Sequence, residues 1–159
     1  MNVPLLAGSD DEIFLWALDQ VVPPLLTAFN PDVVVTQLGA DTHRTDPLTN
    51  LAMTTTGFAE AVRRLQPLCR RWIALGGGGY NLENVPRSWT LAWATMNARE
   101  IPDEMPRSFL TAFQRLGFRA TRLRDDPTPV EAPTREQAWR FVREQVHRIQ
   151  RLVFPHHGL

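Results

Sequence analysis

The feature that most constrains the fold of this chain is an apolar run rich in β-branched residues, DVVVTQL at residues 32–38. Such a run is typical of a strand that is buried on both faces, as in a parallel sheet covered by helices. A second short run of the same kind, WIAL, lies at residues 72–75. Because a helical pattern from about residue 57 to 71 separates the two, we expect an α/β fold with a parallel sheet.

A long helix is predicted before the first strand. Ser9 is its expected N-cap, with Glu12 three residues later completing a capping box. Pro23 and Pro24 are expected to interrupt this helix, because Pro24 has no backbone N–H to bond four residues back. The residues expected to face the core are Phe14, Leu18, Val21, Val22, Leu25 and Phe29.

Two more helices are predicted after the second strand. One opens near Asn84, and its expected apolar face consists of Trp89, Ala92, Trp93 and Met96. The last opens at Thr134, with Gln137 completing a capping box. Residues 103–133 are expected to be largely irregular, with one short helix near 106–116. Two or three strands do not complete a sheet of this class, so we expect either an unusually small sheet or a chain that is part of something larger.

Length and composition fit one globular domain of 159 residues, with 43% hydrophobic residues and a formal net charge of zero. The absence of net charge predicts no direct binding to nucleic acid. No apolar run approaches the roughly 18 to 20 residues of a membrane span, so no membrane partner is expected. The single cysteine, Cys69, and a start without a leader pattern favour a cytoplasmic protein. All seventeen basic residues are arginine, which indicates a GC-rich prokaryotic genome.

Both loops that follow the strands contain unusual residues. LGADTHRTDPL, at residues 38–48, follows the first strand, and GGGGY, at residues 76–80, follows the second. In open α/β sheets, ligands bind beyond the carboxyl ends of the strands. If the strands are parallel neighbours, Asp41 and Tyr80 therefore converge on one crevice.

Two interpretations of the first loop remain open. Asp41, His43 and Asp46 offer carboxylate and imidazole groups that suit Zn²⁺ or Fe²⁺. A metal site normally needs three protein ligands, however, and aspartate is also a common turn residue. The alternative is a solvated turn with no ligand.

The glycine run of the second loop allows a close approach of the backbone. It lacks the Lys-Ser or Lys-Thr of a P-loop, and Asn81 stands where a dinucleotide-binding loop has its third glycine or alanine. The glycines are therefore predicted to serve shape and to present Tyr80. The alternative is that Tyr80 packs on a neighbouring helix.

Taken together, PDVVVTQLGADTHRTDPL and LGGGGYNLENVPRSWTLAWA resemble the C-terminal half of the histone deacetylase family. Similarity is closer to the prokaryotic branch that includes acetoin-utilisation proteins, which NVPL near the start and FPHHGL at the end also resemble. The resemblance thins between residues 103 and 133. It implies a three-layer, arginase-like α/β fold, a parallel sheet flanked by helices, of which residues 1–159 form a C-terminal portion.

The resemblance further implies zinc-dependent (or Fe²⁺-dependent) hydrolysis of acetylated lysine or of a small acetylated amine. Zn²⁺ lowers the pKa of bound water and polarises the amide carbonyl. Asp41 matches the family's aspartate metal ligand, and Tyr80 matches the catalytic tyrosine that hydrogen-bonds the substrate carbonyl. The positions that match the walls of the acyl-lysine channel are Pro47, Leu48, Gly78 and Gly79.

This sequence departs from the family in one respect. Full-length members have, upstream, a histidine pair that acts as general base and acid, and an Asp-x-His pair that completes the metal site. No two histidines are adjacent before His156, and nothing before Asp41 reads Asp-x-His. We therefore expect the chain to be a C-terminal portion that works only with the missing N-terminal half, either from a truncated reading frame or from a protein split into two chains. The alternatives are an inactive remnant or interaction module with the same fold, and an unrelated α/β domain whose glycine-rich loop binds a small anion.

Overall fold

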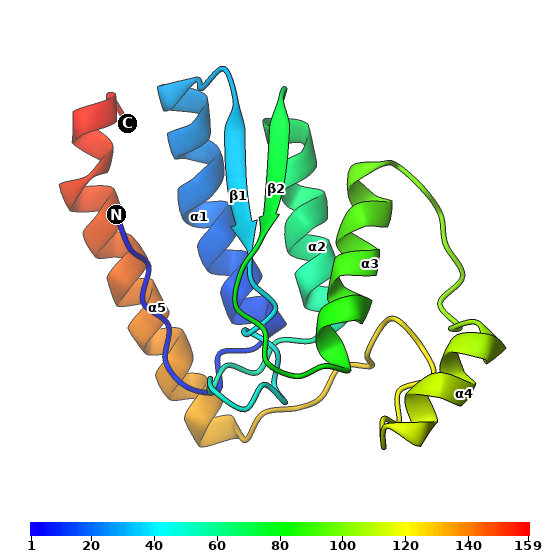
Figure 1. Cartoon of the computed structure of the whole chain (residues 1–159). Coiled ribbons are helices and arrows are strands. Elements are labelled where there is room, and N and C mark those ends of the chain that lie inside the picture. Colours follow the sequence, from blue (N-terminus) through cyan, green and yellow to red (C-terminus); the bar gives the residue numbers. More distant parts are fainter.

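The computed structural model describes residues 1–159, and Figure 1 shows the order of the elements along the chain. The helices and strands are α1 Asp11–Phe29, β1 Val34–Leu38, α2 Thr55–Leu65, β2 Trp72–Gly76, α3 Asn84–Met96, α4 Arg107–Arg115 and α5 Ala132–Leu152. Short 3₁₀ turns cover Gln66–Leu68 and Phe154–His157. The predicted short helix within the irregular region is confirmed by α4.

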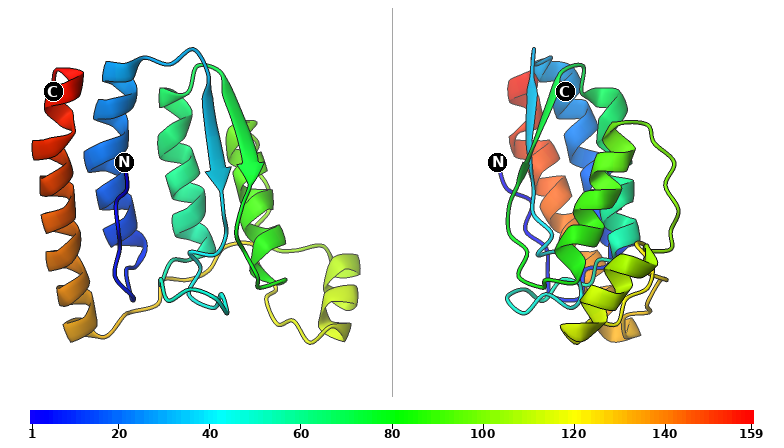
Figure 2. Two further views of the ribbon diagram at one scale, coloured as in Figure 1. Left: turned by 60° about the vertical axis from the view of Figure 1, so that its left-hand side comes forward. Right: turned by 45° about the vertical axis from the view of Figure 1, so that its right-hand side comes forward.

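The two strands form a parallel sheet, in register from Val34 opposite Trp72 to Leu38 opposite Gly76. This confirms an α/β fold with a small parallel sheet. Helices α1, α2 and α3 lie on one side of the two strands, and α5 packs beside α1 at the end of the row (Figure 2). The structure thus has a sheet layer and one helix layer, and does not itself contain a second helix layer.

The two faces of the sheet are not equally covered, so the prediction that β1 is buried on both faces is wrong. Leu38 and Trp72 pack against the buried cluster of Phe58, Val62 and Ala92, on α2 and α3. On the opposite face the residues are largely exposed to solvent. The exposed fraction is 58% for Val35, 50% for Ile73 and 51% for Leu75. We call Val33, Val35, Ile73 and Leu75 the open face.

The largest core cluster lies between α1 and α5. It consists of Ile13, Ala17, Val21, Ala138, Val142, Val146 and Ile149. A smaller cluster of Leu91, Met105 and Leu123 joins α3 to the irregular region on either side of α4. The helix row is therefore held together by apolar packing that does not involve the open face.

Helix ends and exposed residues differ from prediction at several positions. The N-cap of α1 is Asp10, whose carboxylate accepts from the Ile13 N–H, while the Ser9 hydroxyl donates to the Leu6 carbonyl instead. The last helix begins at Ala132, and its N-cap is Glu131, three residues before the predicted cap Thr134, without a side-chain cap bond. Helix α1 continues through Pro23 and Pro24, so the predicted interruption is wrong. Phe29 and Trp93, which were expected to face the core, are exposed.

Helix α1 also differs from expectation in its hydropathy. It spans 19 residues, and by length and composition it is long and apolar enough to cross a membrane. In the structure the helix packs between α2 and α5, and residues on its inner side, such as Ile13 and Val21, are fully buried. The same composition therefore also serves a core helix.

Candidate functional site

The loops after β1 and β2, residues 39–48 and 77–84, lie against each other at the carboxyl ends of the strands, and we call them together the loop edge. The Ala40 N–H donates to the Gly78 carbonyl oxygen at 2.6 Å. A Cβ at Gly77 would lie 3.0 Å from the Gly39 Cα, and one at Gly78 would overlap the Asp41 carboxylate. The glycines therefore allow the two backbones to meet, which is the shape role that the sequence predicts.

The structure brings Asp41 and Tyr80 to the same edge of the sheet. Asp41 is half-buried beside Gly78, and none of the side-chain hydrogen bonds involves its carboxylate. Tyr80 is 55% exposed, and its hydroxyl has no hydrogen-bond partner. Tyr80 is thus presented to solvent and not packed on a neighbouring helix.

Asp46 joins the two loops and is only 7% exposed. One carboxylate oxygen accepts the Leu48 N–H at 2.9 Å, and the other accepts the Tyr80 N–H at 2.8 Å. The side chains of Pro47 and Leu48 remain exposed beside it. Asp46 is therefore a structural link between the loops, with both of its oxygens bonded to backbone.

His43 is buried in the same loop, and both of its ring nitrogens are used. Nδ1 accepts the Asn84 side-chain amide at 2.7 Å and the Thr45 backbone N–H at 3.2 Å. Nε2 must then carry the ring proton, which it donates to the Asp125 carboxylate at 2.8 Å. His43 thus has no nitrogen left for a metal or a substrate, and the simple solvated turn is wrong as a description of this loop.

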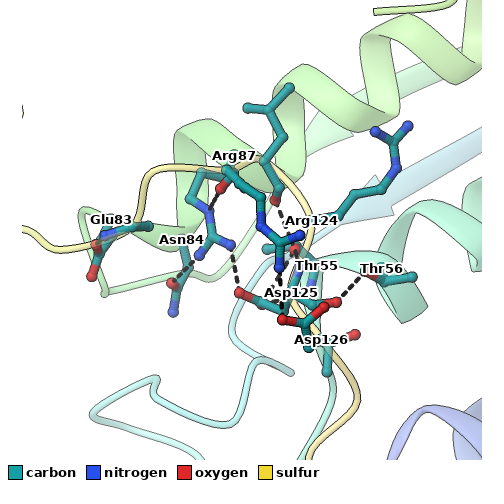
Figure 3. Close-up of polar contacts among 12 residues, drawn as sticks. Thr55, Thr56, Glu83, Asn84, Arg87, Arg124, Asp125 and Asp126 are labelled. Atoms are coloured by element: carbon teal, nitrogen blue, oxygen red, sulfur yellow. Dashed lines mark hydrogen bonds and ion pairs between the residues drawn. The ribbon is translucent and has the colours of Figure 1, made fainter. Parts of the chain in front are cut away.

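Asp125 is the polar hub behind the loop edge (Figure 3). Besides His43, its carboxylate accepts the Thr55 N–H at 3.1 Å and forms an ion pair with Arg87, which is 4% exposed. Burial raises the pKa of the Asp125 carboxyl, but the hydrogen bonds from His43, Arg87 and Thr55 outweigh it and hold that pKa well below its usual range. The charged carboxylate therefore stabilises the fold where the two loops meet.

Sequence reasoning missed this hub. Asp125 follows His43 by 82 residues and lies in the irregular region, where no periodicity marks it. The one signal near it is a pair of aspartates before Pro127, which resembles an ordinary turn. Nothing in the sequence marks Asn84 and Arg87 as buried residues either, because polar side chains in the first turns of a helix are usually solvated.

The side chains of this chain do not form a complete metal site. No group of three histidine, cysteine, aspartate or glutamate side chains lies close enough together to hold a metal ion. Asp41 alone at the loop edge has a carboxylate without a partner, and zinc sites normally use at least three protein ligands.

The fold and the loop edge define the chain as an α/β domain that presents its candidate site at the carboxyl ends of parallel strands. The model of the histone deacetylase domain matches residues 1–96, which include both loops. The chain belongs to the histone deacetylase family.

Relatives come from all three domains of life. The chain is 36% identical over 120 residues to the acetoin utilization protein AcuC of Bacillus subtilis, covering 72% of this chain and 31% of that protein. It is 38% identical over 106 residues to histone deacetylase 8 of Xenopus tropicalis, and the match covers 67% of this chain and 29% of that protein. It is 35% identical over 88 residues to a probable deacetylase of Archaeoglobus fulgidus, and the match covers 52% of this chain and 24% of that protein. The chain therefore matches about a third of the length of these relatives or less.

Proposed function

We propose that this chain is the part of a metal-dependent deacetylase that supplies one metal ligand and the residue that polarises the substrate carbonyl. The substrate is an acetylated lysine or a small acetylated amine. The observation that supports this most directly is the contact between the two loops, because it brings an unbonded carboxylate, Asp41, and an unbonded phenol, Tyr80, to one edge. The names of the relatives, deacetylases and an acetoin utilization protein, agree with this class of reaction.

Tyr80 acts by hydrogen bonding. Hydrolysis of an amide adds water to the carbonyl carbon and then breaks the C–N bond, leaving acetate and a free amine. The carbonyl oxygen becomes an oxyanion in the intermediate, and a phenol O–H at hydrogen-bond distance stabilises that charge. In this proposal Pro47 and Leu48, with the Gly78–Gly79 backbone, form the channel wall beside the phenol.

The chain supplies neither the general base nor a complete zinc site. The base must come from elsewhere because both nitrogens of His43, the histidine at the loop edge, are engaged. In this proposal Asp41 holds one position of a Zn²⁺ or Fe²⁺ ion, whose chemistry is to activate water and polarise a carbonyl. The histidine pair and the Asp-x-His pair of the N-terminal half supply the rest.

The open face agrees with a missing half. Val35, Ile73 and Leu75 expose half or more of their side chains on one side of a two-stranded sheet. Each strand pairs on one edge only, so the other edge offers unpaired N–H and C=O groups. An N-terminal half that adds strands and covers this face would complete a three-layer fold.

The test is to complete the enzyme. The full chain is fused behind the part of the Bacillus subtilis relative that precedes the matched segment, a protein that we call the complemented enzyme. We expect turnover of an acetyl-lysine reporter, and we expect Asp41→Asn to abolish both turnover and tight zinc binding. A folded complemented enzyme that binds zinc but shows no turnover would overturn the proposal.

The second candidate is an inactive remnant or interaction module, which the absence of a complete metal cluster favours. Calorimetric zinc titration of the isolated chain, followed by titration of the complemented enzyme, separates the two candidates. The deacetylase proposal predicts weak or no binding by the chain alone and stoichiometric binding after completion. A remnant shows no gain on completion.

A further inference from the structure

We propose that Asp46 is a positioning residue that sets the place of Tyr80 relative to the channel wall. This inference rests on the proposed function, because it concerns how the phenol reaches a substrate carbonyl. Asp46 lies five residues after Asp41 and belongs to the other loop from Tyr80. It has no free atom with which to bind a metal or a substrate.

The Asp46 carboxylate accepts two backbone hydrogen bonds, one in each loop. A charged carboxylate only accepts hydrogen bonds, and bonds to a charged acceptor are shorter and stronger than those between neutral groups. One oxygen holds the N–H of Leu48 at 2.9 Å, and the other holds the N–H of Tyr80 at 2.8 Å. One rigid group thus fixes the backbone of the catalytic residue and that of the wall residue at the same time.

The loop that presents Tyr80 needs such an anchor. Residues 76–79 are all glycine and carry no side chains of their own, and Gly79 has φ at 139°, a backbone conformation that residues with a side chain rarely adopt. The last bond from the first loop before this point joins Ala40 to Gly78. Beyond that bond, the Asp46 carboxylate is the group of the first loop that holds the Tyr80 backbone.

The hydrogen bonds made by residues that follow Tyr80 in the chain do not replace those of Asp46. The Asn81 side-chain amide donates to the Thr45 carbonyl at 3.1 Å, and Asn84 donates to the Thr45 hydroxyl at 2.7 Å. These bonds restrain the residues that follow Tyr80. Asp46 alone contributes a side-chain bond to Tyr80 itself, so its loss should shift the phenol while the rest of the loop edge stays in place.

Asp46→Asn is the sharpest variant, because it preserves the shape and removes one of the two acceptors. The new amide nitrogen would face a backbone N–H, and two donors repel each other. In the complemented enzyme we expect kcat to fall by about 10- to 100-fold, the scale of an ångström-sized misplacement. Asp126→Asn, on an exposed residue paired with Arg122, is the matched control and should leave kcat unchanged.

A double-mutant cycle with Tyr80→Phe separates positioning from general damage. If Asp46 acts through the Tyr80 hydroxyl, Asp46→Asn should cost at most about twofold in kcat once that hydroxyl is absent. The same factor in both backgrounds would overturn the inference and leave the proposed function intact. If Tyr80→Phe itself has no effect on kcat, both proposals fail.

Amide hydrogen exchange of the full chain tests the geometry without an assay of activity. We expect Asp46→Asn to speed exchange of the Tyr80 and Leu48 N–H groups, and Asp126→Asn to change neither. Unchanged protection at Tyr80 would overturn the inference. If Asp46→Asn does not fold, Asp46→Glu takes its place in both experiments, because it keeps the charge but places the oxygens one methylene further out.

Discussion

The loop edge and the open face are built from the same two strands, yet they differ in how complete they are. At the loop edge, Asp46, His43 and Asp125 all have their hydrogen-bonding atoms paired within the chain, and no buried side-chain polar atom lacks a partner. On the open face, Val35, Ile73 and Leu75 leave half or more of their apolar surface in water.

The difference separates two requirements of a catalytic domain. The geometry of the candidate site depends on contacts that this chain makes with itself. The open face, in contrast, has no cover within this chain. The predictions below test this separation, first at the loop edge and then on the sheet.

Asp125→Asn should have the largest effect, because it breaks the hub behind the loop edge. It leaves the Arg87 guanidinium, which is 4% exposed, without its charged partner. Removing one partner of a buried ion pair typically costs about 3 to 5 kcal/mol, so we expect the free energy of unfolding to fall by that amount. Urea unfolding of the chain measures it, with Asp126→Asn as the exposed control. A loss no larger than that of the control would mean that the loop edge does not depend on this hub.

Tyr80→Phe should affect turnover and not stability. The hydroxyl bonds to nothing in the chain, so its removal should leave urea unfolding unchanged. In the complemented enzyme, loss of one oxyanion donor should lower kcat by about 10²-fold or more, equal to about 2.7 to 4 kcal/mol. Steady-state kinetics on the acetyl-lysine reporter provide the measurement, and an unchanged kcat would remove Tyr80 from the mechanism.

Two leucines on the strands compare the two faces of the sheet directly. Leu38 packs on the cluster of Phe58, Val62 and Ala92, while Leu75 is 51% exposed on the open face. In the isolated chain we expect Leu38→Ala to cost about 2 kcal/mol of unfolding free energy and Leu75→Ala less than about 0.5 kcal/mol.

Adding the N-terminal half should change the free-energy cost of Leu75→Ala and leave that of Leu38→Ala unchanged. If the N-terminal half covers the open face, the cost of Leu75→Ala in the complemented enzyme should rise toward that of Leu38→Ala. An equal cost of Leu75→Ala in both proteins would show that the open face stays in water.

Acid should produce the smallest effect, confined to low pH. The pKa of Asp125 is lower in the folded chain than its ordinary value of 3.8, so its stabilising contribution is complete above that pH and declines as the pH falls below it. The stability difference between the wild type and Asp125→Asn should therefore shrink below about pH 4, by at most about 1.4 kcal/mol per pH unit. Urea midpoints at several pH values test this, and a difference that grows on acidification would contradict the sign.

The sequence predicted the loop edge because it follows from local rules. Two apolar runs separated by a helix predict adjacent parallel strands, and parallel strands end at the same edge. Gly77 and Gly78 in one loop and Gly39 in the other then allow the contact that the structure has.

What could not be predicted depends on residues far apart in the chain or on competition between neighbours. Asp125 reaches His43 across 82 residues, which no spacing rule contains. The sequence predicted Ser9 as the N-cap of α1, but Asp10 caps the helix and the Ser9 hydroxyl donates to the Leu6 carbonyl instead. The apolar character of β1 predicts burial on both faces, but it does not reveal that one face is left exposed in this chain.

The long reach of Asp125 has a consequence for the timing of folding during synthesis. Ribosomes add about 5 to 20 residues per second, so His43 exists for several seconds before Asp125 is made. During that interval His43 and, once it is made, the Arg87 guanidinium lack the Asp125 carboxylate. The nascent chain thus passes through a stage in which both strands are complete and the contacts of Asp125 are not yet formed.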